Sequence, residues 1–415
     1  MSIPLLEESS ELIKNEDLVE KYEQLYWSPF LTWIYMWVNA IKDSALFIDA
    51  PDCVFYKADM LYKTHDLYSE LKKPSINTKL YFSWVMPNRM VNWYDDKMKS
   101  KLSLIDKNSN FNLGVVTCMP VTWLLWVQYN NIYWDFEKDF LFVPSFTDKF
   151  RIDGYTIFLK ELAKKIFLDT TKVKKNKNIS IIWYLYDRNE GDCIWNIEEI
   201  KRIMELIWVK INSIWLDWWN YNDLSKVEES ELLISLPNWK YAWKILKKRL
   251  NIELLELDVP FWLKNTISFI SSIWSKLWIE KNILDKVIKN ELNKVKWKID
   301  LLDSRCFLNK NYIYAWDPFL EDWIKDIWLF LWMNHIKTYS YIWDKQPKWR
   351  DIWNINIDII IGNSDFNFLW DKLKKLEFWF PSYNTHFLTN RPYMWFEGLL
   401  NFIERLYKEV WKQIN

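Results

Sequence analysis

Glycine is nearly absent from a chain that has many turns to make. The 415 residues include 5 Gly and 31 Trp, whereas an ordinary chain has roughly 7% Gly. The stretch "INSIWLDWWNYNDL" places Trp218 and Trp219 where a strand has to turn. Turns favour Gly, Asn, Asp, Pro or Ser, because these residues reach positive φ or bond their own backbone. Indole side chains do neither, so the sequence conflicts with its own turns.

Other Trp residues also stand where Gly is expected. Trp332 in "FLWMNHI" ends a helical pattern, the usual place of a C′ glycine. Trp316 follows a strand pattern, and Trp379 and Trp395 lie in loop patterns. The simplest hypothesis is translational. In some uncultured bacterial lineages UGA encodes glycine, and a table that reads UGA as tryptophan writes Trp at each such codon.

Under this hypothesis most of the Trp residues are Gly in the living cell. A structure built on the literal sequence is then expected to place indoles in turns and at helix ends, often at positive φ. Trp33 and Trp215, which have apolar neighbours, are candidates for genuine tryptophan. The alternative is a protein that is truly rich in Trp, and UGG codons at Trp218, Trp219 and Trp332 would support it.

Length, charge and cysteine count narrow the class of protein. A chain of 415 residues is too long for one core. Its 55 basic and 55 acidic residues balance, so nothing indicates a nucleic-acid or membrane-surface partner. No signal peptide is visible, and no apolar run reaches the 18 or so residues of a membrane span. We expect a cytoplasmic protein.

The alternation of patterns predicts an α/β fold. After "ISIIWYLYD", a continuous apolar strand pattern, a helix is expected over 196–210 with Asn196 as its N-cap, followed by further strands and helices in turn. Among these we predict a helix over 240–250, a strand over 304–316 and a helix over 318–333. We predict three consecutive Rossmann-like domains with doubly wound parallel sheets. Their predicted ranges are 1–172, 178–297 and 298–415.

Two cysteines follow strand patterns of the first domain. Cys53 comes after "ALFIDAP" and Cys118 ends "NLGVVTC". Open α/β sheets bind ligands beyond the carboxyl ends of their strands, although cysteines are also often simply buried. Cys193 and Cys306 are interpreted as structural. The chain has no CxxC motif and no His-rich cluster that would indicate a zinc site.

The order of these segments resembles the nitrogenase component 1 superfamily, which includes dark-operative protochlorophyllide reductase. With Trp read as Gly, "SPFLTWIYMWVNAIKDSALFIDAPDC" resembles the segment that carries the family's first two cysteines, and "VVTCMPVTWLLWVQ" resembles the third cysteine block. "DIIIGNSD" and "FWFPSYNTHFLTNRPYMWFEGLLNFIERL" resemble the C-terminal signature. The likeness covers nearly the whole chain.

The resemblance implies a site and partners. It implies a homodimer, or a heterodimer with a sister subunit, that holds an iron–sulfur cluster, of the [4Fe–4S] type, between its subunits. A separate ATP-binding iron protein would supply the electrons. Cys53 and Cys118 would be metal ligands. Ser28 stands at the family's first cysteine, and an alkoxide ligates iron less readily than a thiolate.

Two further departures bear on the reaction. The ligands that hold the catalytic cofactor of nitrogenase fall at Ser235 and Met394. No FeMo-type cofactor is therefore expected, and reduction of an organic substrate fits better than dinitrogen fixation. One alternative is a non-catalytic partner subunit or cofactor-assembly scaffold. Another, reached from the pattern alone, is a nucleotide-sugar transferase with two Rossmann domains, which leaves the loop cysteines unexplained.

Overall fold

We analysed a computed structural model of the chain. It describes residues 41, 43–50, 79–84, 94–117, 136–143, 151–184, 194–215, 220–237, 240–302, 304–316, 320, 324–326, 330–340, 356–362, 374–378 and 389–411. Trp33, Trp218, Trp219 and Trp379 lie outside these ranges, as does most of the helix predicted near residue 320.

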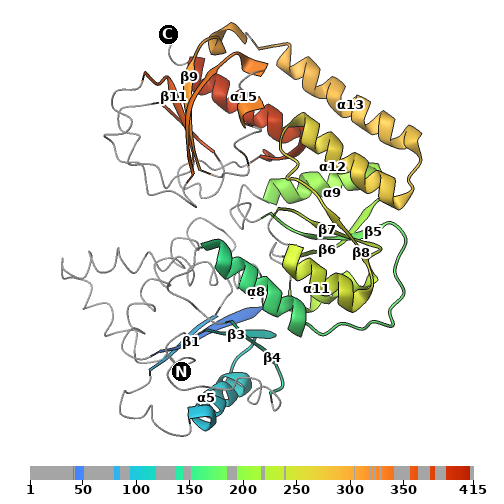
Figure 1. Cartoon of the computed structure of the whole chain (residues 1–415), viewed down its shortest axis with the longest axis vertical. Coiled ribbons are helices and arrows are strands. Elements are labelled where there is room, and N and C mark those ends of the chain that lie inside the picture. Colours follow the sequence, from blue (N-terminus) through green and yellow to red (C-terminus); the bar gives the residue numbers. More distant parts are fainter. Residues whose placement is uncertain are drawn as a thin grey trace, which may run out of the picture. The chain divides into compact units, whose positions relative to one another are not determined.

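The described part of the chain contains three four-stranded sheets, and all three have the same strand order. The orders are β2-β1-β3-β4, β6-β5-β7-β8 and β10-β9-β11-β12. In each sheet the chain therefore starts at an inner strand, moves to one edge, and then crosses to the other side of the first strand. That order creates a switch point between the first and third strands (Figure 1). The predicted α/β class with three Rossmann-like sheets is confirmed.

The first sheet is parallel throughout its registered pairs. Its inner strand β3 is buried along its whole length, with five buried residues in a row, as is typical of a parallel sheet that is covered on both faces. Helices α5 and α8 belong to the same part of the chain. The elements are β1 (Ser44–Ala50), β2 (Lys79–Trp84), α5 (Tyr94–Asn108), β3 (Leu113–Thr117), β4 (Asp139–Phe142) and α8 (Arg151–Lys165).

The second sheet begins with β5, whose five residues are all buried. The predicted strands and helices occur in the predicted order, and the helix over 240–250 has the predicted bounds. The elements are β5 (Asn178–Ile182), α9 (Ile194–Leu206), β6 (Lys210–Trp215), α10 (Tyr221–Leu224), the 3-10 helix η3 (Ser225–Glu229), β7 (Leu232–Ser235), α11 (Lys240–Leu250) and β8 (Glu253–Glu256).

The third sheet follows two long helices and is parallel in its registered pairs. Gly362 ends β11 so close to β9 that an added Cβ would lie 2.4 Å from the Ala315 carbonyl oxygen. The elements are α12 (Trp262–Leu277), α13 (Lys281–Ile299), the 3-10 helix η4 (Ser304–Phe307), β9 (Asn311–Trp316), β10 (Asn334–Ser340), β11 (Ile359–Gly362), β12 (Lys375–Glu377) and α15 (Trp395–Trp411).

The contacts divide the chain into two compact units. Unit 1 takes residues 1–174, 180–182 and 212–254, and unit 2 takes 175–179, 183–211 and 255–415. The strands of each sheet all lie inside one of the three predicted domain ranges. The division into two units does not follow the boundaries at 172, 178 and 298, so these boundaries stay a prediction.

Unit 1 joins helices α8 and α11, which lie side by side. Arg249 on α11 donates from its two terminal nitrogens to the carbonyl oxygens of Ala163 and Ile166, at 2.7 and 2.9 Å. The last carbonyls of a helix have no partner within it. The guanidinium therefore caps α8 with a charge of the favourable sign, and burial lowers the pKa of Arg249.

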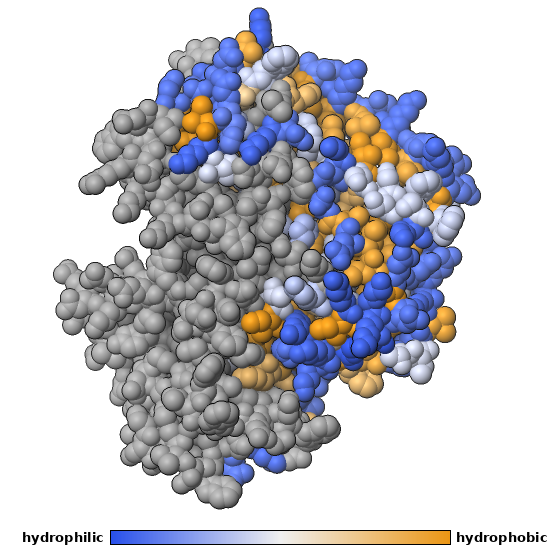
Figure 2. Space-filling model, in the orientation of Figure 1, coloured by the Kyte–Doolittle hydropathy of each residue, from blue (hydrophilic) through white to orange (hydrophobic). Residues whose placement is uncertain are grey.

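Unit 2 packs α15 against α9, α12 and α13 (Figure 1). Figure 2 shows hydrophilic residues along the outer side of this region, with hydrophobic residues between them. No helix in the described part of the chain is both long enough and apolar enough to cross a bilayer.

Two local predictions were wrong. Asn196 is not the N-cap of its helix, because α9 already begins at Ile194 and the Asn196 side chain bonds elsewhere. The strand expected over 304–316 starts with a 3-10 helix and is extended only from Asn311. Strand β12 and helix α12 have no counterpart in the sequence prediction.

Candidate functional site

The switch point of the first sheet lies between β1 and β3. These strands are parallel neighbours, and Ile48 pairs with Thr117, the last residue of β3. The carboxyl ends of both strands therefore leave the sheet at one edge, with β2 and β4 on the outer sides. This edge is where doubly wound sheets bind their ligands.

Both candidate cysteines follow this edge in the sequence. Cys118 is the next residue after Thr117, and Cys53 comes three residues after Ala50, the last residue of β1. Cys53, Cys118 and the third candidate, Ser28, lie outside the described residues. The structure thus fixes the strand ends that precede the two cysteines.

Thr117 has a buried hydroxyl at this edge. Its side chain is fully buried, and its Oγ1 has no hydrogen-bond partner among the described residues. Leaving a buried hydroxyl without a partner costs about 1–3 kcal/mol. Thr117 precedes the candidate metal ligand Cys118 in the sequence. A group bound at this edge of the sheet would explain why the Thr117 hydroxyl has no partner among the described residues. Sequence reasoning missed this hydroxyl, because Thr is also a common strand residue.

The amino-terminal side of β1 is held by Asp43. The carboxylate of Asp43 accepts the backbone N–H of Tyr221 at 2.6 Å and also a hydrogen bond from the side-chain amide of Asn112. Burial raises the pKa of Tyr221, and the charge of Asp139 raises it further. Strand β1 is thus anchored at the end opposite the switch point. Nothing in this cluster suggests chemistry.

Ser235 and Met394, which stand at the positions of nitrogenase cofactor ligands, are both buried. Ser235 is the last residue of β7, and its hydroxyl donates to the adjacent carbonyl oxygen of Leu236 at 3.1 Å. Met394 precedes α15, and its backbone N–H donates to Asn196 Oδ1 at 2.9 Å. The Ser235 side chain thus bonds to the backbone, and Met394 bonds to the Asn196 side chain through its own backbone N–H.

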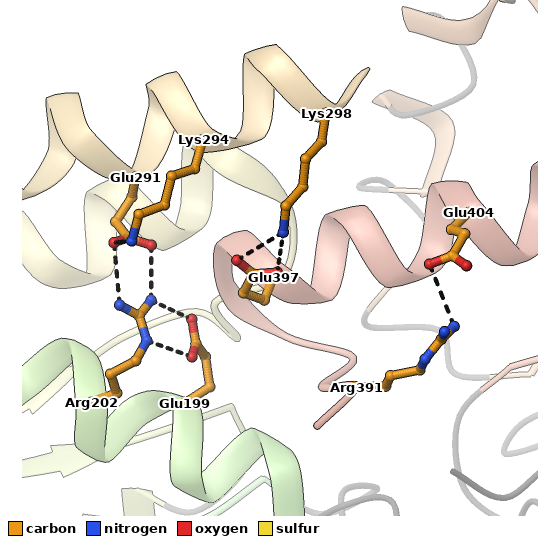
Figure 3. A network of polar contacts seen from close by, with 8 residues as sticks. All are labelled: Glu199, Arg202, Glu291, Lys294, Lys298, Arg391, Glu397 and Glu404. Atoms are coloured by element: carbon orange, nitrogen blue, oxygen red, sulfur yellow. Dashed lines mark hydrogen bonds and ion pairs between the residues drawn. The ribbon is translucent and has the colours of Figure 1, made fainter. Parts of the chain in front are cut away.

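A network of charged residues in unit 2 was missed by the sequence analysis. Arg202 on α9 donates to both carboxylate oxygens of Glu199, at 2.7 and 2.8 Å, and to both of Glu291 on α13, at 3.2 and 2.8 Å (Figure 3). Lys294 adds a 2.7 Å bond to Glu291. The spacing of Glu199 and Arg202 suggests a pair within the helix, but the bridge to α13 has no local signal.

Burial and pairing act oppositely in this network. Burial raises the pKa of Glu199, and this effect outweighs the hydrogen bonds and charge of Arg202. Burial also raises the pKa of Glu291, but hydrogen bonds from Arg202 and Lys294 outweigh it, so this pKa lies below its usual value. The hydrogen bonds from Glu199 raise the pKa of Arg202. The charges of Arg202 and Lys294 together balance those of Glu199 and Glu291, and Arg202 ties α9 to α13.

The remaining polar candidates do not form a metal centre. Among the described residues, no group of three or more His, Cys, Asp or Glu side chains is placed to hold a metal ion. Cys306, interpreted as structural, is buried as a free thiol. His335 shares a 2.9 Å hydrogen bond with Thr338 on β10. His65, His386 and Cys193 lie outside the described ranges.

Comparison with known proteins identifies the class of fold. The fold of three α/β sheets with one strand order is similar to that of solved nitrogenase structures. The structure described as "Nitrogenase Cp1 at pH 6.5" superposes with a TM-score of 0.74 at 14% identity, covering 92% of each chain. "Nitrogenase Cp1 at pH 5" gives 0.65 at 12% identity, covering 92% of this chain and 89% of that one.

The expected nitrogenase component 1-like fold is therefore confirmed, and at this identity the likeness shows the fold. No protein-family model matches the chain, and no curated protein matches it.

Proposed function

We propose that the chain is a subunit of a nitrogenase-like oxidoreductase, the component that receives electrons from an ATP-binding iron protein. One observation carries the proposal: Cys118 directly follows β3 and Cys53 comes three residues after β1, and these two strands flank the first switch point. Buried free thiols need no such placement. The match to solved nitrogenase structures over 92% of the chain supports the same reading.

The donor set fits an iron–sulfur cluster shared between subunits. Such clusters are held by cysteine thiolates, usually four. Two cysteines per chain, with Ser28 as a weaker third donor, match half of a [4Fe–4S] site in a homodimer or a heterodimer. The buried Thr117 hydroxyl adds a hydrogen-bond donor beside Cys118. When bound, the cluster would supply one-electron transfer, and these residues would hold it and tune its potential.

The substrate is proposed to be an organic molecule and not dinitrogen. The resemblance places the nitrogenase cofactor ligands at Ser235 and Met394, and neither a neutral hydroxyl nor a thioether replaces thiolate and imidazole. Both residues are buried, with the backbone contacts described above. A FeMo-type cofactor is therefore not part of the proposal.

Iron and acid-labile sulfide, measured in protein purified without oxygen, test the cluster. We expect about two to four irons per chain, lost in the Cys53→Ala, Cys118→Ala double variant. Cys306→Ala is the matched control, because it removes a buried thiol from another part of the fold. Equal iron in the double variant and in this control would contradict the assignment of ligands.

A partner subunit or assembly scaffold of the same superfamily is the second candidate. The substitutions at Ser28, Ser235 and Met394 favour it, since each replaces a stronger metal ligand. A folded protein that binds no iron, and that raises the activity of a separate catalytic subunit, would support this candidate and exclude electron transfer through this chain.

We also propose that UGA is read as glycine in the protein's own cell. With Trp read as Gly the likeness to the superfamily covers nearly the whole chain, and the chain has 5 Gly and 31 Trp. The codons decide this question independently of the proposed activity. UGG codons at Trp218, Trp219, Trp332 and Trp395 would contradict it.

A further inference from the structure

Tryptophan dominates the left-handed backbone positions. Eight residues other than glycine have positive φ in the described part, and five of them are Trp. No described glycine has a positive φ. Bulky L-residues are genuine outliers there, whereas Gly reaches the region freely. The five are Trp208 (61°), Trp262 (67°), Trp278 (51°), Trp332 (58°) and Trp395 (68°).

Two of these residues close helices in the manner of a glycine. After α9, Val209 N–H donates to the Met204 carbonyl and Trp208 N–H to the Glu205 carbonyl, at 2.9 and 3.0 Å. This is the hydrogen-bond pattern of a Schellman motif, whose C′ residue is usually Gly. Trp278 caps α12 with φ 51° and ψ 44°, and its N–H bonds the Trp274 carbonyl.

The indoles at these helix ends gain little from their surroundings. Trp278 is 90% exposed, Trp332 72% and Trp208 63%. For Trp, a positive φ and an exposed indole are both unfavourable. For Gly, which has no side chain and reaches positive φ freely, neither carries a cost.

Trp215 and Trp243 behave differently. Both are fully buried, and their rings lie 5.7 Å apart. The indole N–H of Trp215 donates to the Leu224 carbonyl at 3.2 Å, and that of Trp243 to the Ile234 carbonyl at 2.7 Å. Neither has a positive φ. These are the contacts expected of genuine buried tryptophan.

Two buried indoles lack such contacts. The ring nitrogens of Trp195 and Trp274 are buried with no hydrogen-bond partner among the described residues. A buried indole N–H normally finds an acceptor. These two residues therefore resemble the helix-end group in being poorly served by their surroundings, although their φ angles are not positive.

We propose that the Trp residues form two populations: positions 208, 262, 278, 332 and 395 carry glycine in the native protein, and positions 215 and 243 carry tryptophan. This assignment rests on the proposed recoding and is independent of the proposed activity. Position 395 depends on φ alone, because its indole is buried, donates to the Asn196 carbonyl at 3.2 Å and lies 5.1 Å from Phe269.

Thermal unfolding of single variants of the literal chain tests the two populations. Trp278→Gly and Trp332→Gly are expected to raise the unfolding midpoint, each by on the order of 2 °C. Trp243→Gly is the matched control. It is expected to lower the unfolding midpoint, by several times the size of that rise, because it removes a packed side chain. A midpoint lowered equally by Trp278→Gly and Trp243→Gly would overturn the assignment.

The gene gives a second readout that does not depend on folding. We expect UGA at 208, 262, 278, 332 and 395, and UGG at 215 and 243. UGG at 208, 278 or 332 would overturn the glycine assignment. UGA at 215 and 243 would overturn the division into two populations, while leaving the cluster proposal at Cys53 and Cys118 untouched.

Discussion

Ile48 of β1 pairs with Thr117 of β3, so the chain segments that carry Cys53 and Cys118 leave the first sheet at one edge. This register is a property of the backbone and does not depend on the identity of either cysteine. It brings to a single switch point the ends of two strands that precede cysteines 65 positions apart in the sequence (118 − 53). The same strand order recurs in the other two sheets, but no cysteine directly follows their flanking strands.

Thr117→Val tests whether the buried hydroxyl serves a ligand. In protein without iron, Oγ1 has no partner among the described residues, so an apolar replacement of the same shape should change the free energy of unfolding by less than about 1 kcal/mol. In iron-loaded protein the variant should have a shifted reduction potential, because hydrogen bonds to cluster sulfur tune it.

Thr117→Ser is the control for that experiment, since it keeps the donor. A hydroxyl that serves only the fold would make Thr117→Val clearly destabilising without iron, with no difference in potential between the two variants.

Asn196→Ala should strongly destabilise the native state. Asn196 Oδ1 accepts the backbone N–H groups of Tyr393 and Met394, at 2.6 and 2.9 Å, and joins α9 to the segment before α15. The variant leaves two buried donors without a partner, which costs about 2–4 kcal/mol in total. Unfolding in urea measures this loss of stability as a lower midpoint concentration, with the dependence of the unfolding free energy on urea concentration unchanged. Asn196→Asp keeps an acceptor oxygen and should lose less; an equal loss would mean that packing dominates.

Arg202→Gln should leave Glu199 and Glu291 without their shared counter-charge. Both carboxylates are buried, although the guanidinium is about one-third exposed, so we expect a loss of about 2–3 kcal/mol at pH 7. Lys201→Gln on the same helix breaks only an exposed pair with Glu198 and should cost less than about 0.5 kcal/mol.

The loss in Arg202→Gln should depend on pH. Burial already raises the pKa of Glu199, and without Arg202 nothing in the network opposes that effect. A raised folded-state pKa favours the protonated form, so the deficit should shrink as the pH falls from 7 towards the usual carboxyl pKa and should be greatest above the raised value. A deficit that is constant between pH 7 and pH 5 would show that the carboxylates do not titrate with the network.

The sequence predicted the fold class well because its strongest signals are local. The strands at β1, β3 and β7 are short apolar runs bounded by polar residues, and α11 has a clear amphipathic pattern. The expected indoles at positive φ were also found, at Trp332 and Trp395 among others. A Trp at a position where Gly is expected thus helps to locate turns and helix ends in the sequence.

Longer-range features escaped prediction for physical reasons. Asn196 looked like an N-cap because Asn favours that position, but a tertiary acceptor role took its side chain. The bridge from Arg202 to Glu291 joins residues 89 positions apart, and no pattern within one helix encodes it. Helix α12 was missed although its buried residues Phe269, Ile273 and Leu277 recur at helical spacing.

Low-temperature electron paramagnetic resonance of protein reduced with dithionite tests the central claim most directly. Protein purified without oxygen should show the signal of a reduced iron–sulfur cluster, and the signal should disappear in the Cys53→Ala, Cys118→Ala double variant while persisting in Cys306→Ala. A folded, iron-free protein without a signal, or a signal that survives in the double variant, would contradict a redox site at the first switch point.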